Sequence, residues 1–241
     1  LVDDIDHAET SIYLESYIFN HDAIGLKIVR SLQSAASRGV ACKILVDGCG
    51  SPHWGVSIAK KLEKSGVKTR VFHPFPWQIW NWSRAAIKAP KILRWIFLLL
   101  NINSRNHRKI CLIDNRITYV GSINITKEHL SLSEGGHGWR DTAIRITDTN
   151  TDSLQKILDD TWTHISIQER LRKAFSDIKQ DPIFRLNHTR HRRRILYKQL
   201  LRKIDRCQKR IWITNAYFIP DTILLHHLKR IAAQGADVRI L

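Results

Sequence analysis

The sequence predicts an α/β fold, in which a mixed, largely parallel sheet is flanked by helices. One complete repeat is followed by the β-α-β start of a second. Three observations predict this fold. Residues 12–46 read as strand, amphipathic helix and strand in succession. The same succession returns about 200 residues later. Between the copies, two short apolar runs flank a polar turn at residues 114–116, which is typical of a β-hairpin.

The first β-α-β unit lies at the start of the chain. Residues 1–10 have the apolar spacing of a helix end, and residues 12–19 (IYLESYIF) that of a strand. Residues 22–37 place apolar side chains on one helical face, and Gly39 ends the helix. Residues 41–46 form the next strand. A helix between two strands predicts that the strands are parallel.

Further elements follow in both copies. They are a helix at 57–65, strands at 67–72, 110–113 and 117–120, a helix beginning at 126–132, a strand at 143–146, a helix at 151–169, a helix at 195–207 and a strand at 210–218.

An internal repeat sets the domain organisation. An offset of 199, falling to 196 after a three-residue deletion, aligns ten identical residues. They include Asp22 with Asp221 and Gly39 with Gly235, which a chance match of apolar patterns does not explain. We therefore expect a first repeat at 1–170, a basic linker at 171–194 and the start of a second repeat at 195–241.

The ends of the sequence suggest a fragment. The chain has no methionine, begins inside a helical pattern and ends inside a strand pattern. We expect that it is cut at both ends and that targeting or membrane-anchoring segments are missing. Hydrophobic residues make up 43% of its 241 residues, which is normal for a globular protein.

The charge predicts an anionic partner. The formal net charge is +17, which favours nucleic acid or an anionic membrane surface. The four cysteines form no C-x-x-C pair and the histidines have no zinc spacing, so we expect no metal and no cofactor. Buried thiols at Cys42 and Cys111 fit a reducing environment.

The stretch from Arg105 to Asn124 (RNHRKICLIDNRITYVGSIN) holds the candidate site. Residues two apart on a strand face the same way, so His107 and Lys109 should share one face. The hairpin would bring Ser122 and Asn124 near them. An ammonium group with hydroxyl and amide donors suits a phosphodiester, and a histidine can attack phosphorus or transfer a proton.

The full string, HxKx4D followed by GSxN, resembles the HKD motif of the phospholipase D superfamily. WRDT at 139–142 and ITNAYFIPD at 213–221 are similar to bacterial cardiolipin synthases. The resemblance implies a phospholipase D-like fold with two HKD motifs that form one active site. The second H-x-K would fall near 107 + 196 = 303, beyond the 241 residues of this chain.

The implied reaction is phosphatidyl transfer. One histidine attacks phosphatidylglycerol and forms a phosphohistidine, and the other histidine serves as acid and base while a second phosphatidylglycerol accepts the phosphatidyl group to give cardiolipin. His107 is interpreted as the nucleophile, with the acid/base role left open.

The resemblance also implies roles for other residues. Lys109, Ser122 and Asn124 would hold phosphoryl oxygens, and Asp114 would brace the motif. Asp141 would lie beside His107 and orient it; the alternative is an aspartate bonded to Arg140 or to a loop backbone. Glu15 is a further candidate to face the site.

The segment 73–100 suggests contact with a membrane. Its run 92–100 (ILRWIFLLL) is nearly all apolar but too short to span a bilayer. It is either a core or lid helix, or an interfacial segment whose basic side chains meet head groups. The residues concerned are Trp77, Trp80, Trp82, Trp95, Lys88, Lys91 and Arg94. The basic run 188–194 (HTRHRRR) is either a solvated linker or a phosphate-binding segment.

Three functions follow. The favoured one is a phosphatidyltransferase at the cytoplasmic membrane, peripheral or anchored by missing parts, with phosphatidylglycerol as partner. The first alternative is a phospholipase D-type phosphodiesterase or endonuclease acting on DNA. The second is a non-catalytic module that binds anionic membranes or nucleic acid.

Overall fold

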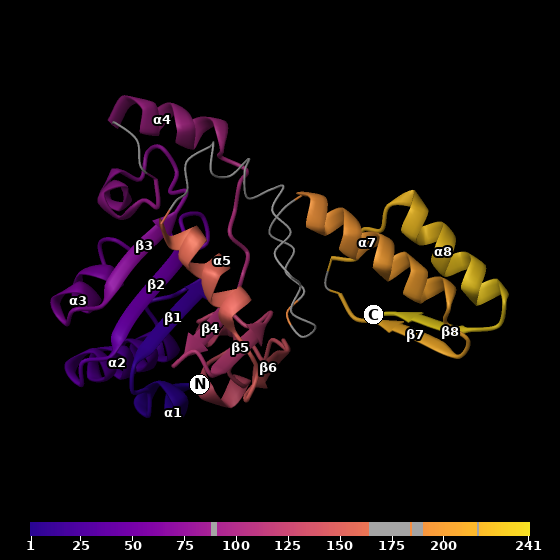
Figure 1. The fold of residues 1–241 in the computed structure, drawn as a ribbon, viewed down its shortest axis with the longest axis horizontal. Coiled ribbons are helices and arrows are strands. Elements are labelled where there is room, and N and C mark those ends of the chain that lie inside the picture. The colour runs from indigo at the N-terminus through magenta and orange to yellow at the C-terminus, as the bar shows by residue number, and fades with distance from the viewer. Residues whose placement is uncertain (88–90, 164–183, 185–189, 216) are drawn as a thin grey trace. The chain divides into compact units, whose positions relative to one another are not determined.

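The computed structural model describes residues 1–87, 91–163, 184, 190–215 and 217–241 (Figure 1). The chain divides into two compact units, Leu1–Arg172 and Lys173–Leu241. The predicted linker at 171–194 falls mostly outside the described residues, as does the end of the predicted helix at 151–169. The domain boundaries therefore stay a prediction.

The first unit is built on a six-stranded sheet with the order β3-β2-β1-β4-β5-β6. The strands are β1 (Ser11–Ser16), β2 (Ala41–Asp47), β3 (Lys68–Phe72), β4 (Ile110–Ile113), β5 (Ile117–Gly121) and β6 (Ala143–Ile146). β1, β2 and β3 pair in parallel, and the pairings from β1 through β4 and β5 to β6 are antiparallel. Four of the six strands thus run in one direction, which confirms a mixed, largely parallel sheet.

Helices cover both faces of this sheet (Figure 1). On one face, α1 (Val2–Asp6), α2 (Ala23–Ser37) and α3 (Ile58–Lys64) share a buried apolar cluster with the sheet. On the other face lies α5 (Asp152–Thr163), whose Leu158 carbonyl accepts a hydrogen bond from Tyr13. Neighbouring residues of a strand point to opposite faces. Tyr13 and Glu15 therefore lie on the α5 side, whereas Leu14 joins the α2 side.

The predicted hairpin is present and ends in a tight turn. The Arg116 N–H donates to the Ile113 carbonyl, 3.0 Å away. Asp114 and Asn115 have positive φ angles of 51° and 54°. Ile113 pairs with Ile117, so three residues connect the strands, and Asp and Asn tolerate positive φ better than most residues. This turn fixes how β4 pairs with β5. His107 and Lys109 lie just before β4 begins.

Two predicted elements differ in the structure. β1 ends at Ser16 rather than at residue 19, because the chain then turns to meet the segment after β5: Phe19 bridges to Ile125. The helix expected from 126 to 132 is instead two 3-10 turns, η2 (Lys127–His129) and η3 (Leu132–Glu134). A Cβ at Gly136 would lie 2.3 Å from the Leu130 carbonyl oxygen, so the chain folds back too tightly for a continuing helix.

The tryptophan-rich segment forms η1 (Ile79–Arg84) and α4 (Lys91–Leu100). Lys88 lies outside the described residues. Leu98 is fully buried, whereas Leu93, Trp95, Ile96, Leu99 and Leu100 are exposed. α4 is therefore not a core helix. Among the described residues, no helix combines the length and apolarity needed to cross a bilayer.

The second unit contains α7 (Arg190–Asp205), β7 (Arg210–Ile213), α8 (Thr222–Ala233) and β8 (Asp237–Ile240). β7 pairs with β8 in parallel, and Arg210 lies opposite Asp237 as Ser11 lies opposite Ala41 in the first unit. These pairs are related by the offsets 199 and 196. The structure therefore confirms the repeated β-α-β unit.

Candidate active site

His107 and Lys109 lie together just before β4 begins, at the edge of the sheet where β1 ends. Lys109 Nζ is 3.1 Å from His107 Nδ1 and 3.2 Å from Nε2. The Tyr17 ring contacts both: its centroid is 4.6 Å from that of the imidazole and 5.2 Å from Lys109 Nζ. An aromatic face attracts a cation, so Tyr17 helps to hold the ammonium group at the site.

The surroundings set the protonation of this pair. Burial lowers the pKa of His107, and the neighbouring Lys109 lowers it further, against an opposing effect of Asp47. Burial lowers the pKa of Lys109 to about 8, while Asp141 and Asp47 act in the opposite direction. Near pH 7 the pair is thus a neutral imidazole beside a charged ammonium. A neutral imidazole has the lone pair that a nucleophile needs.

Ser122 and Asn124 lie on the loop that follows β5. Ser122 N donates to the Thr142 carbonyl at 2.9 Å, and the Ser122 hydroxyl donates to Asp141. Asn124 Oδ1 accepts from the Ile18 N–H at 3.1 Å. Because that oxygen is engaged, the amide group is fixed with its NH2 donors pointing the other way. A Cβ at Gly121 would lie 2.3 Å from the Thr142 oxygen, so only glycine fits before this loop.

His129 connects the parts of this loop. Its Nε2 accepts from the Asn124 N–H at 3.3 Å, and its Nδ1 lies 3.7 Å from an Asp141 oxygen. Its ring lies edge-on to Trp139. The His129 ring therefore links Asn124, near the start of the segment 121–141, to Asp141 at its end.

Asp141 contacts Ser122 and His129 rather than His107. In the described part of the chain it pairs with Ser122 and His129 and makes no hydrogen bond to His107. The register of β6 explains the contact with Ser122: Ala143 lies opposite Gly121, so Thr142 comes opposite Ser122 and Asp141 follows directly beside it. Its orienting role toward His107 stays a prediction.

Asp114 lies away from the site and holds the start of β1. Its carboxylate accepts from the backbone N–H groups of Glu9, Thr10 and Ser11 at 2.8–3.0 Å. The Thr10 hydroxyl donates to it as well. Asp114 thus ties the hairpin turn to the neighbouring strand, as expected for a bracing residue.

Several residues at the site were not predicted from the sequence: Tyr17, Asp47, Asn106 and His129. Asp47 is fully buried and accepts from the Asn106 N–H at 2.8 Å and from the Cys49 N–H at 2.7 Å. Glu15 is also buried, and its side chain bonds to the neighbours of His107 instead of facing a substrate. Asn106 directly precedes His107 in the sequence, and this position could have identified it as a residue of the site.

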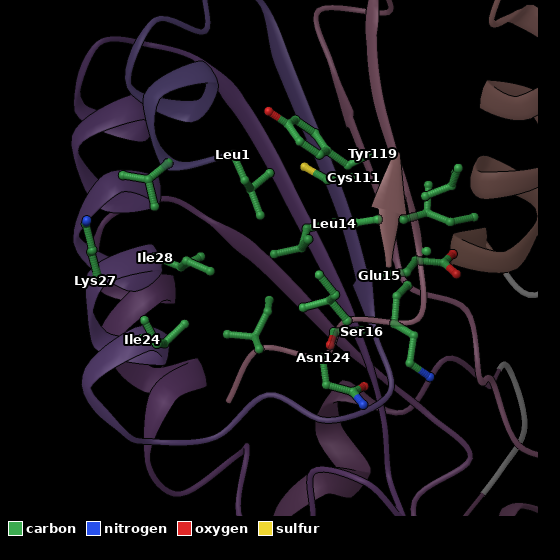
Figure 2. Close-up of a pocket in the computed structure, with 18 of the residues that line it drawn as sticks. Leu1, Leu14, Glu15, Ser16, Ile24, Lys27, Ile28, Cys111, Tyr119 and Asn124 are labelled. Carbon is green, nitrogen blue, oxygen red and sulfur yellow. The ribbon is translucent and has the colours of Figure 1, made fainter. Parts of the chain in front are cut away.

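An apolar cavity of about 490 Å3 adjoins the site between α1, α2 and the sheet. Figure 2 shows Ser16 and Asn124 toward one end and Leu1 and Tyr119 toward the other. We assign this cavity no ligand.

Metal ligands do not gather here. The described residues contain no group of three His, Cys, Asp or Glu side chains arranged to hold a metal ion.

Known proteins resemble this chain over most of its length. Residues 1–162 match the family described as "Cardiolipin synthase, PLD-like domain". Cardiolipin synthase from Halalkalibacterium halodurans is 34% identical over 237 residues, which are 95% of this chain and 44% of that protein. Cardiolipin synthase B from Salmonella typhi is 28% identical over 98% of this chain and 55% of its own length. The chain spans about half the length of the curated relatives that it matches.

A solved structure shares the fold. Phosphatidylserine synthase from Haemophilus influenzae superposes on 99% of this chain and 57% of its own length, with a TM-score of 0.61 and 13% identity. The superposition shows the shared fold, and the family match over residues 1–162 shows that the chain belongs to the cardiolipin synthase family of phospholipase D-like proteins.

Proposed function

We propose that the full-length protein is a phosphatidyltransferase that makes cardiolipin from phosphatidylglycerol. The observation that carries the proposal is the His107 imidazole held 3.1 Å from Lys109 Nζ in a chain of this family. An imidazole nitrogen attacks the phosphorus, and the phosphorus–oxygen bond to the terminal glycerol breaks. The departing oxygen takes a proton from the histidine of the second motif.

The second half of the reaction reverses these roles. The same second histidine accepts the hydroxyl proton of another phosphatidylglycerol. That oxygen then attacks the phosphorus, the phosphorus–nitrogen bond breaks, and His107 is regenerated. Lys109 and Asn124 stabilise the charge on the phosphoryl oxygens, and Ser122 joins them when its hydroxyl proton turns from Asp141 to the substrate. Asp141 acts on the same loop through Ser122.

A turnover assay on the full-length protein tests this proposal. Liposomes that contain phosphatidylglycerol should yield cardiolipin and glycerol in equal amounts, and His107→Ala should abolish the yield while the protein stays folded. His137→Ala is the matched control, because His137 is an exposed histidine paired with Glu128. DNA cleavage without lipid turnover would replace the proposal with an endonuclease, and binding without either reaction would indicate a non-catalytic module.

We also propose that η1 and α4 contact the membrane surface. The support is a set of exposed apolar side chains: Trp77 is 61% exposed, Trp80 38%, Trp95 46% and Leu100 79%. Tryptophan is favoured at the membrane–water boundary. Trp82 is half-buried, and Arg94 donates to its carbonyl at 2.8 Å, so these two contribute to holding η1 against α4. The protein would then act at the cytoplasmic membrane, peripherally or through anchors outside this chain.

Vesicle flotation tests the membrane surface. Trp95→Ser combined with Leu99→Ser should weaken binding to phosphatidylglycerol vesicles without lowering the unfolding temperature, since both side chains are exposed. Leu132→Ser removes an even more exposed leucine from η3 and serves as control. Equal binding by all three proteins would rule this surface out.

A further inference from the structure

A buried carboxylate lies behind the catalytic motif. Glu15 is 1% exposed and points to the α5 side of the sheet. Its Oε1 accepts from the Tyr13 hydroxyl at 3.0 Å and from Arg108 Nη2 at 3.2 Å. Its Oε2 accepts from Asn106 Nδ2 at 2.9 Å and lies 2.9 Å from Arg108 Nε. Both oxygens are thus saturated by protein donors, and none is left for a substrate.

The two residues held by this carboxylate are the immediate neighbours of His107. Asn106 and Arg108 also bond to each other, because Asn106 Oδ1 accepts from Arg108 N at 3.3 Å and from Arg108 Nε at 3.1 Å. Arg108 reaches α5 through the Thr161 hydroxyl at 2.7 Å. We call Glu15, Asn106 and Arg108 the carboxylate clamp.

A second buried carboxylate fixes the backbone of the clamp. Asn106 donates its N–H to Asp47 at the end of β2. The side chain and the backbone of residue 106 are therefore held by acceptors on two different strands, β1 and β2. Only His107 stands between the two fixed residues, so the backbone that carries the imidazole has little freedom.

We propose that Glu15 is a positioning residue, which acts through Asn106 and Arg108 to hold the His107 imidazole in line for attack on phosphorus. The inference rests on the proposed function. A small displacement of a reacting group can slow a reaction about 100-fold, so a rigid support behind the nucleophile has a direct catalytic value.

The alternative is a purely structural role, in which the clamp is a buried ion pair that only stabilises the fold. Removing one partner of such a pair leaves an unpaired buried charge, whereas replacing both is often harmless to stability. Positioning and stability can therefore be separated. Replacing both Glu15 and Arg108 by neutral residues removes the unpaired buried charge. It does not restore the hydrogen bonds that hold residues 106 and 108 in place.

The experiment uses the full-length protein with phosphatidylglycerol liposomes. Glu15→Gln should lower kcat about 10- to 100-fold with KM changed by less than about twofold. The double variant Glu15→Gln, Arg108→Gln should recover the unfolding temperature and keep the low kcat. Recovery of kcat together with stability would overturn the proposal, as would an unchanged kcat in Glu15→Gln.

Asp4→Asn is the matched control. Asp4 is also a carboxylate that accepts from an arginine and a tyrosine, Arg145 and Tyr119, and it joins α1 to β5 and β6 away from the motif. This variant should lower the unfolding temperature and leave kcat unchanged.

A readout without turnover keeps the proposal separate from the function. NMR of labelled histidine, assigned with His107→Gln, follows the titration of His107. Burial is the main cause of its lowered pKa, so a loosened imidazole in Glu15→Gln should titrate at higher pH. Lys109, Asp47 and Tyr17 also face the ring, and they are unchanged in Glu15→Gln and Asp4→Asn alike. If the protein turns over no lipid, the proposed function is wrong. If the pKa of His107 is the same in Glu15→Gln as in wild type, the positioning role of Glu15 is wrong.

Discussion

Lys109 makes the site sensitive to alkaline pH. Burial lowers its pKa to about 8, so its ammonium group loses a proton as the pH rises through that value. A neutral amine no longer attracts a phosphodiester. We expect KM for phosphatidylglycerol to rise about tenfold per pH unit above about pH 8, in steady-state assays.

Lys109→Arg is the test of this assignment. A guanidinium group stays charged throughout this range, so the variant should show no rise in KM even if its activity is lower. An alkaline rise of the same size in Lys109→Arg would assign the effect to another group.

His107 sets the acid side of the profile. Its lowered pKa keeps the imidazole neutral below its ordinary range, and the nucleophile is lost only as the pH falls through that lowered value. We expect kcat to fall on the acid side below about pH 6.5, the ordinary value for histidine. A midpoint above about pH 6.5 in the pH dependence of kcat would contradict the assignment of this fall to His107.

Asp114 stabilises the fold rather than the reaction. Burial by itself would raise the pKa of this carboxyl, but the N–H groups of Ser11, Glu9 and Thr10 outweigh that effect and lower it. A lowered pKa contributes stability above the unfolded value, and this stability is lost as the pH falls. Asp114→Ala should lower the free energy of unfolding by about 1–3 kcal/mol at pH 7, measured by urea denaturation.

Asp114→Asn is the milder comparison, because asparagine tolerates the positive φ and keeps one acceptor oxygen. The difference between wild type and Asp114→Ala should shrink in acid, where the wild-type carboxylate becomes protonated. A difference that is constant from pH 7 to pH 3 would count against the backbone bonds as its source.

At the scale of elements, the helix caps repeat with the sequence. Asp22 accepts from the Gly25 N–H at 3.0 Å, and Asp221 from the Leu224 N–H at 2.8 Å, at the starts of α2 and α8. Asp22 also accepts from the Lys127 N–H. Asp22→Ala should cost about 1–2 kcal/mol in urea unfolding, and Asp22→Asn much less, since Asn is an equally good cap. Equal losses would show that the charge, not the cap, matters.

The strands, helices and hairpin of the first unit were largely predictable from periodicity, because each buries one face. The helix expected at 126–132 was not: its apolar residues suit a helix, but the close return of the chain at Gly136 does not. Periodicity also left α4 open between core and interface. The exposure of Trp95 and Leu99 decides against the core.

The proposed site residues are close together in the sequence, whereas the residues packed behind them are not. His107, Lys109, Ser122 and Asn124 stand in one string, so their types and spacing indicate phosphate chemistry. Asp47 and Glu15 come from other strands, 60 and 92 residues earlier than His107. A strand pattern shows that Glu15 and Leu14 face opposite sides, but not which side carries α5.

For the whole molecule, charge should dominate the first contact with a membrane. The formal net charge is +17, and anionic lipid attracts each nearby Lys or Arg by about 1 kcal/mol. Binding of the full-length protein to phosphatidylglycerol vesicles should weaken several-fold between 0.05 and about 0.5 M salt, since salt screens exposed charges. Flotation assays measure this directly.

The apolar contribution should survive salt. The residual binding at high salt should be lost in the variant Trp95→Ser, Leu99→Ser, whose substitutions leave the net charge unchanged. If this variant still binds the vesicles at high salt, the apolar contact lies on a surface other than α4.

The two copies of the β-α-β unit agree in register, caps and glycine turns, yet they differ at the position of Glu15. The offset of 199 places Thr214 opposite Glu15. A threonine hydroxyl can accept a hydrogen bond from an arginine, but it carries no charge to pair with the guanidinium group. The buried carboxylate of β1 is therefore a feature of the first copy, and the second copy carries an uncharged side chain at the same place.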